Sequence, residues 1–262
     1  MDGVDFYVHA AILLRASSNA FNSLFTASIK PPGSPGSTLQ HYAVPGTDAA
    51  TLNVVLHVAY GLNVSRYSPD LRVLKQALES VLVTYAFSPY IYVAPASPLY
   101  SVLLSQAVTG GVNVAMEVYA LAAQHRLEPL AVAVSEQLLS FDLSLLTDEQ
   151  AIQLGGSYLK RLFVLLMTRV DKLRELLAIE PGPLHPPTPM CDKLERRRDL
   201  FGAWAYAVAQ LMADARADTP SALLESILNP LAYRCACGEC RVAIQQRVQT
   251  LVRDWDAVKR TI

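Results

Sequence analysis

Cysteine and histidine residues in the C-terminal third of the chain have the types and spacing of a metal site. Cys237 and Cys240 form a C-x-x-C pair, which can place two thiolates on one metal ion, and Gly238 between them can take a tight turn. His185 and Cys191 lie upstream and would complete a tetrahedral set of three thiolates and one imidazole. This donor set suits Zn²⁺, and a site closed by four protein ligands is structural.

Cys235 offers a different fourth ligand for the same site, in place of His185. A plain alternative stays open beside both versions. Four thiols and a loop histidine could simply pack in the protein, because cysteine is among the residue types most often buried. The sequence therefore predicts either a structural zinc site or a set of packed thiols.

Recognisable catalytic arrangements are missing from the rest of the sequence. The chain has no G-x-S-x-G, Walker, G-x-G-x-x-G or H-E-x-x-H motif. His9 is expected to be a buried core histidine, while His57 and His125 fall on apolar helices and are expected to be structural or half exposed. We therefore expect no enzymatic activity and assign no catalytic residue.

Four tyrosines in the middle of the first half have two interpretations. They could line an exposed aromatic patch that binds a partner, or they could pack in the core, which is the favoured interpretation. These residues are Tyr85, Tyr90, Tyr92 and Tyr100.

Short strand candidates alternate with helices over the first half of the chain. The strand candidates span residues 4–9, 41–44 and 91–93. The expected helices cover residues 10–27, a segment that begins after Thr47 and Asp48, another that begins at residues 68–70, and residues 97–108, 112–124 and 127–140. This alternation predicts an α+β fold.

Only helices are expected from Thr147 onward. Thr147 and Gln150 can form a capping box, and the helix behind them is predicted to reach about Leu177. Residues 181–189 contain five prolines and are expected to form a stiff connector. Further helices are predicted over residues 193–215, 219–231 and 242–258.

Composition narrows the classes of function. Hydrophobic residues make up 52% of the 262 residues and charged residues 17%, below the roughly 25% of an average soluble protein, which favours a chain that associates with itself or with a partner. The net charge of −1 argues against general nucleic-acid binding.

Apolar runs fall short of the ~20 residues that a membrane span needs. Asp2 and Asp5 do not fit a secretory signal, so we expect the cytoplasm or nucleus and reduced cysteines.

The N-terminal segment Phe6-Tyr7-Val8-His9, followed by Ala10-Ala11-Ile12-Leu13-Leu14, resembles the entry to a BTB/POZ domain. The whole pattern is similar to a group of uncharacterised BTB proteins from mushroom-forming fungi. The segments that carry this likeness are residues 8–14, 117–123, 146–149, 158–162, 184–191, 255 and 258–262. One departure is that a strand which usually precedes the buried histidine is missing or lost to truncation, because only eight residues come before His9.

The resemblance implies a BTB/POZ-like core of short strands and helical hairpins over residues 1–145. An all-α extension that carries the possible zinc knuckle would cover residues 146–262. It also implies a non-catalytic protein-interaction module that forms homodimers or docks other proteins. By family analogy alone, it suggests a substrate adaptor for a cullin-type ubiquitin ligase.

Two other functions remain as alternatives. One is a transcriptional regulator that contacts DNA through Arg196–Arg198 and Arg241, although the basic run fits a solvated helix face better and the charge balance is unfavourable. The other is an enzyme whose site the sequence does not reveal. A deep pocket with several polar groups would distinguish that case.

Overall fold

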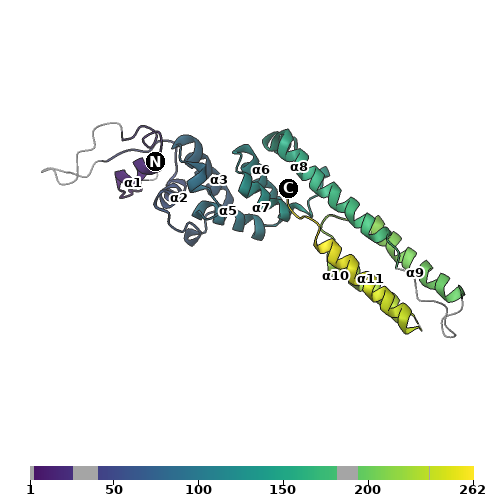
Figure 1. Ribbon diagram of the computed structural model, residues 1–262. Helices are drawn as coiled ribbons and strands as arrows, with labels where there is room; N and C mark the ends of the chain where they lie inside the picture. The colour runs from purple at the N-terminus through teal and green to yellow at the C-terminus, as the bar shows by residue number, and fades with distance from the viewer. Residues whose placement is uncertain (1–2, 26–40, 182–193, 236) are drawn as a thin grey trace. The chain divides into compact units, whose positions relative to one another are not determined.

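The computed structural model describes residues 3–25, 41–181, 194–235 and 237–262 (Figure 1). The regular elements in these ranges are helices, and the only strand-like pairing there is an isolated bridge between Ser17 and Phe87. The predicted α+β fold with BTB-like short strands is therefore wrong. The described part of the chain is all-helical.

The three strand candidates show why that prediction failed. Residues 4–9 and 41–44 have no regular structure, and the third candidate lies in and just after the helical turn α4 (Pro89–Tyr92). A short apolar run alone does not distinguish a strand from other structures, and an isolated strand lacks the pairing that would stabilise it. In the third case Pro89 occupies the first helical turn, where its fixed φ favours a helix.

The chain divides into two compact units, which we describe separately. The first consists of residues 1–137 and 147–155. Its elements, besides α4, are α1 (Ala10–Ala16), α2 (Ala49–Tyr60), the 3₁₀ turn η1 (Ser65–Tyr67), α3 (Leu71–Glu79), the π turn η2 (Ser80–Thr84), α5 (Pro98–Thr109), α6 (Gly111–Gln124), α7 (Glu128–Ser135) and the 3₁₀ turn η3 (Glu136–Leu138).

Side-chain caps begin three helices of this unit. Asp48 caps α2 by accepting a hydrogen bond from the Thr51 backbone N–H at 2.6 Å, and Asp70 and Ser97 cap α3 and α5 in the same way. The helix starts predicted at these three positions are confirmed. Local hydrogen bonding therefore sets where these helices begin.

The first helix ends at Ala16, well before the predicted end near Ala27. The Ser17 hydroxyl accepts a hydrogen bond from the Phe21 backbone N–H at 2.7 Å, and the Asn19 side chain accepts one from the Asn22 N–H at 2.9 Å. Residues 20–23 all have positive φ. Side-chain bonds to nearby backbone thus replace the right-handed helix with a tight left-handed turn.

The second unit consists of residues 138–146 and 156–262. Its elements are the 3₁₀ turn η4 (Leu143–Leu145), most of α8 (Asp148–Ala178), α9 (Leu194–Ala213), α10 (Ser221–Tyr233) and α11 (Gly238–Asp256). The predicted capping box at the start of α8 is confirmed, because Thr147 and Gln150 exchange two bonds of 3.1 and 3.2 Å. The helix is interrupted at Gly155, where the two units divide.

Buried leucines from α8, α9, α10 and α11 surround two buried tryptophans, Trp204 and Trp255, in the core of the second unit. Two buried arginines join this core to the ends of helices. Arg247 on α11 donates to the carbonyl groups of Leu176 and Ile179 at the C-terminal end of α8. Arg169 on α8 binds backbone carbonyls on both sides of the α10–α11 pair.

Candidate interaction surface

The helical turn α4 packs against an aromatic cluster of the first unit through Tyr92. Phe21 stacks on Tyr85 with ring centroids 3.9 Å apart, and Phe87 lies 4.9 Å from Tyr92. Phe87 on one side of α4 and Val93 on the other are 2% and 3% exposed. A buried residue therefore lies close to each end of the turn.

Backbone hydrogen bonds also hold this region in place. The Ser88 carbonyl accepts bonds from the N–H groups of Ile91 and Tyr92 at 3.1 and 3.0 Å. On the preceding segment, the Ser18 backbone N–H and hydroxyl both donate to the Ala86 carbonyl, and the Asn19 amide donates to the Thr84 carbonyl at 2.9 Å. The chain leading into α4 is thus tied to the turn that follows α1.

The outer side of α4 exposes two large apolar side chains. Tyr90 is 89% exposed and Ile91 is 66% exposed. We name this pair the α4 knob. An exposed aromatic and aliphatic pair on a fixed backbone is suited to enter a pocket of another protein, because little conformational freedom is lost when it binds.

The four tyrosines considered from the sequence divide between core and surface. Tyr85 and Tyr100 are buried, and loss of hydration raises the pKa of each phenol above its usual value. Tyr92 is half-buried against Phe87. Core packing is confirmed for Tyr85 and Tyr100 and is wrong for Tyr90, which is 89% exposed.

His9, His57 and His125 each have a separate partner in the structure. His9 is exposed, so the predicted buried histidine is wrong, and the Tyr60 hydroxyl accepts a hydrogen bond from its backbone N–H at 2.6 Å. His57 Nδ1 lies 2.7 Å from the Asn53 carbonyl oxygen. His125 Nε2 lies 3.1 Å from the Glu79 carboxylate, with its side chain 10% exposed.

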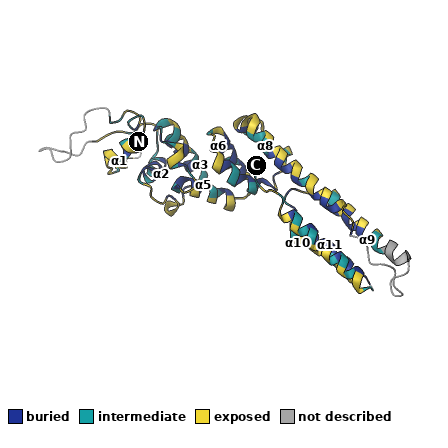
Figure 2. Ribbon diagram, viewed as in Figure 1, coloured by how far each residue is buried: buried dark blue, intermediate teal, exposed yellow. Residues whose placement is uncertain are grey.

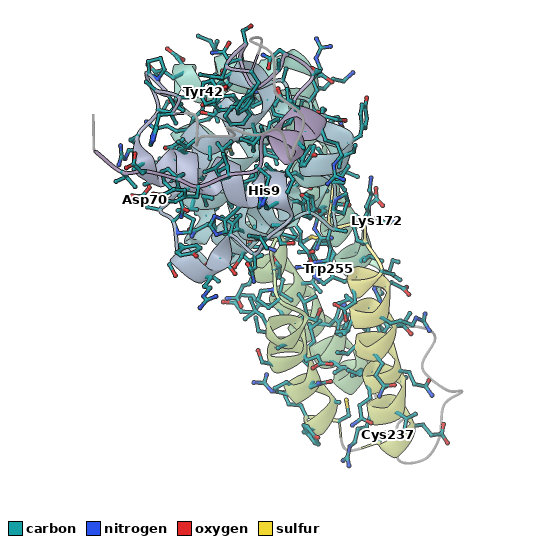
Figure 3. The ribbon with its side chains drawn as sticks, turned by 90° about the vertical axis from the view of Figure 1, so that its left-hand side faces the viewer. His9, Tyr42, Asp70, Lys172, Cys237 and Trp255 are labelled. Atoms are coloured by element: carbon teal, nitrogen blue, oxygen red, sulfur yellow. The ribbon has the colours of Figure 1, made fainter. Side chains whose placement is uncertain are left out.

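The cysteines of the predicted zinc site are described only in part. Cys235 and Cys240 are buried and Cys237 is half-buried at the turn between α10 and α11, and Figure 3 shows Cys237 at the opposite end of α11 from Trp255. The Cys235 thiol lies 3.6 Å from the Leu231 carbonyl oxygen. His185 and Cys191 lie outside the described residues. Within the described residues, no three His, Cys, Asp or Glu side chains come together as metal ligands, and zinc binding by the full set stays a prediction.

The arginines proposed for DNA contact are also partly described. Arg241 is half-buried, and its Nη2 donates to the Cys235 carbonyl at 3.2 Å. Arg196–Arg198 lie on α9. The Arg241 contact shows that this side chain holds the turn before α11, a role that the sequence did not indicate.

Comparisons with protein-family models, with curated proteins and with solved structures find no significant match to this chain. Across the described ranges, no helix combines the length and apolar character that crossing a bilayer requires.

Sequence reasoning missed Ile91 as part of the surface and missed the two buried arginines. The apolar run at Ile91 predicts a strand, whereas the pair Ser88-Pro89, which commonly begins a helix, is the signal for the helical turn. Arg169 carries no comparable local signal. Its burial depends on contacts with residues 48 to 90 positions away in the sequence.

Proposed function

We propose that this chain is a non-catalytic protein-interaction module, and that its first unit docks a partner protein on the α4 knob. The observation that carries the proposal is the exposure of Tyr90 and Ile91, at 89% and 66%, on a turn that lies between the buried side chains of Phe87 and Val93. Side chains in such a position cost free energy in water and recover it when a partner covers them.

The chemistry of the knob indicates the kind of pocket it fits. Tyrosine is enriched at interface hot spots because it combines a large apolar ring with a hydroxyl that hydrogen-bonds at the rim of a pocket. Ile91 beside it adds an aliphatic surface without charge. The partner surface is therefore an apolar depression with a hydrogen-bonding group at its edge.

The more specific roles inferred from the family resemblance have no separate support. The ubiquitin-ligase adaptor role and the transcriptional alternative both stay predictions. The half-buried position of Arg241 makes this side chain less available to a DNA phosphate, because its Nη2 already donates to the Cys235 carbonyl.

Affinity capture with full-length protein tests the docking proposal. The double variant Tyr90→Ala/Ile91→Ser should lose at least tenfold in the recovery of the partner that the wild-type chain captures, since truncation of a hot-spot residue costs about 2 kcal/mol or more. The matched control is Tyr206→Ala/Ile179→Ser, which removes the same residue types, 67% and 55% exposed, from the second unit. Equal recovery by both double variants would refute docking on α4.

A further inference from the structure

Among the residues that the structure describes, one face of α8 in the second unit exposes large apolar side chains. Phe163, Val164 and Met167 are 51%, 49% and 43% exposed. Their spacing places all three on one side of the helix, within about 100° of arc. Figure 2 shows exposed residues recurring along α8. We name these three residues the α8 patch.

Opposite charges lie at the two ends of the α8 patch. Lys160 precedes it by one turn and Asp171 follows it by one turn, and both are exposed. Eleven residues correspond to slightly more than three whole turns, so these two side chains lie within about 20° of each other around the helix axis. From Lys160 to Asp171, the exposed face therefore carries a basic side chain, then the apolar α8 patch, then an acidic side chain.

This order is complementary to itself when the helix is reversed. In an antiparallel pair centred between Leu165 and Leu166, Lys160 of one copy opposes Asp171 of the other, and Val164 opposes Met167. The same alignment brings Phe163 of one copy level with Thr168 of the other along the helix axes, and Thr168 is also exposed. A two-fold axis repeats every one of these contacts, as an interface between identical surfaces requires.

We propose that α8 pairs antiparallel with α8 of a second copy of this chain through the α8 patch. A parallel pair would place Lys160 beside Lys160 and Asp171 beside Asp171, which costs free energy. The Asp171 carboxylate also contacts Arg174 in its own helix at 4.0 Å, but both side chains are about half exposed, so this contact is weak. A surface of this size forms a weak dimer that dissociates on dilution. The proposal does not depend on the α4 knob.

Charge reversal tests this pairing with full-length protein in sedimentation equilibrium. Lys160→Asp places two acidic side chains opposite each other in its homodimer, and Asp171→Lys places two lysines opposite each other. Each variant alone should self-associate about tenfold more weakly than the wild type. An equimolar mixture of the two should regain wild-type association, because each aspartate then opposes a lysine.

Two further variants separate pairing from other effects. Met167→Glu places a charge inside the α8 patch and should abolish association. Lys172→Asp is the control, because Lys172 is exposed but lies about 100° away from Asp171 around the helix, and it should leave association unchanged. Circular dichroism of each variant establishes that the helices are intact. A wild-type chain that stays monomeric at high micromolar concentration, or a mixture that fails to regain association, overturns the proposal.

Discussion

Arg169 places a buried guanidinium group between several elements of the second unit. It is 2% exposed, and its nitrogens donate to the carbonyls of Ala217 at 2.8 Å, Val258 at 2.7 Å and Lys259 at 3.0 Å. Its carbon Cζ lies 4.3 Å from the ring centroid of Trp255, a distance typical of a cation–π contact. One side chain thus holds α8 to the segment before α10 and to the chain after α11.

Replacement of Arg169 by methionine should destabilise the second unit by about 3 kcal/mol, because the buried Ala217 carbonyl and the part-buried carbonyls of Val258 and Lys259 lose their donor. Chemical denaturation followed by tryptophan fluorescence measures this change, since Trp204 and Trp255 both lie in the same core. Arg253→Met, at a side chain 74% exposed, should change stability by less than about 0.5 kcal/mol. Similar losses in the two variants would contradict the role of Arg169.

Asp48 makes the stability of the first unit depend on pH. The hydrogen bond from the Thr51 backbone N–H lowers the pKa of the Asp48 carboxyl below its usual 3.8. The stabilisation is therefore present above that value and is lost as the pH falls through the lower pKa of the folded protein. Asp48→Ala should cost about 1 kcal/mol at pH 7, typical of a lost N-cap.

The same variant should lose less stability relative to the wild type in strong acid, where Asp48 is protonated in both folded and unfolded chains. Thermal unfolding at neutral and acid pH measures the two differences. Asp48→Asn keeps a capping oxygen without the ionisable group, so its effect should vary little with pH. A constant cost of Asp48→Ala across this range would contradict the assignment.

Gly155 interrupts the regular helical backbone of α8. Its φ of 64° and ψ of 165° lie in a region that is accessible essentially to glycine alone. Gly156 follows it without a positive φ, and a Cβ atom at that position would meet open space. The two adjacent glycines therefore have different backbone conformations, and only Gly155 needs the conformational freedom of glycine.

Alanine substitution should distinguish the two glycines. Gly155→Ala forces a side chain into the disfavoured conformation and should cost about 1–3 kcal/mol. Gly156→Ala lowers the entropy of the unfolded chain and should stabilise the protein by about 0.5–1 kcal/mol. Thermal unfolding of the two variants measures the difference, and an unchanged or raised melting temperature for Gly155→Ala would show that α8 runs straight through.

Helix starts could be predicted from the sequence because their signals are local. Asp48, Ser97 and the Thr147–Gln150 box each act on backbone within three residues, so their geometry follows from spacing. Strands could not be predicted in this way, since a strand depends on a partner far away in the sequence. The end of α1 was missed because bonds from the Ser17 and Asn19 side chains outweighed an apolar pattern.

The candidate surface shows the same limit. Tyr85 and Tyr90 are alike in the sequence, yet one is 1% exposed and the other 89%. Stacking on Phe21 buries Tyr85, and nothing within five residues of either tyrosine encodes that contact. Exposure is decided by tertiary packing. The sequence therefore shows that a tyrosine suited to an interface is present, but it does not show whether that tyrosine is exposed to a partner.

Considered as a whole, the chain combines two helical units with separate exposed apolar sites. The α4 knob belongs to the first unit and the α8 patch to the second. A dimer formed through the α8 patch would carry two α4 knobs, one from each copy, and so could bind two partner sites. Binding of two linked sites strengthens attachment to a partner that is itself multivalent.

Site-specific photo-crosslinking tests the central claim of partner docking most directly. A photoreactive phenylalanine analogue replaces Tyr90 in the full chain within cells that make the protein, and the same analogue at Tyr206 serves as the control. Docking through the α4 knob predicts a discrete crosslinked species at position 90 that contains a second protein and is missing from the control. No such species at position 90, or the same species at both positions, would contradict it.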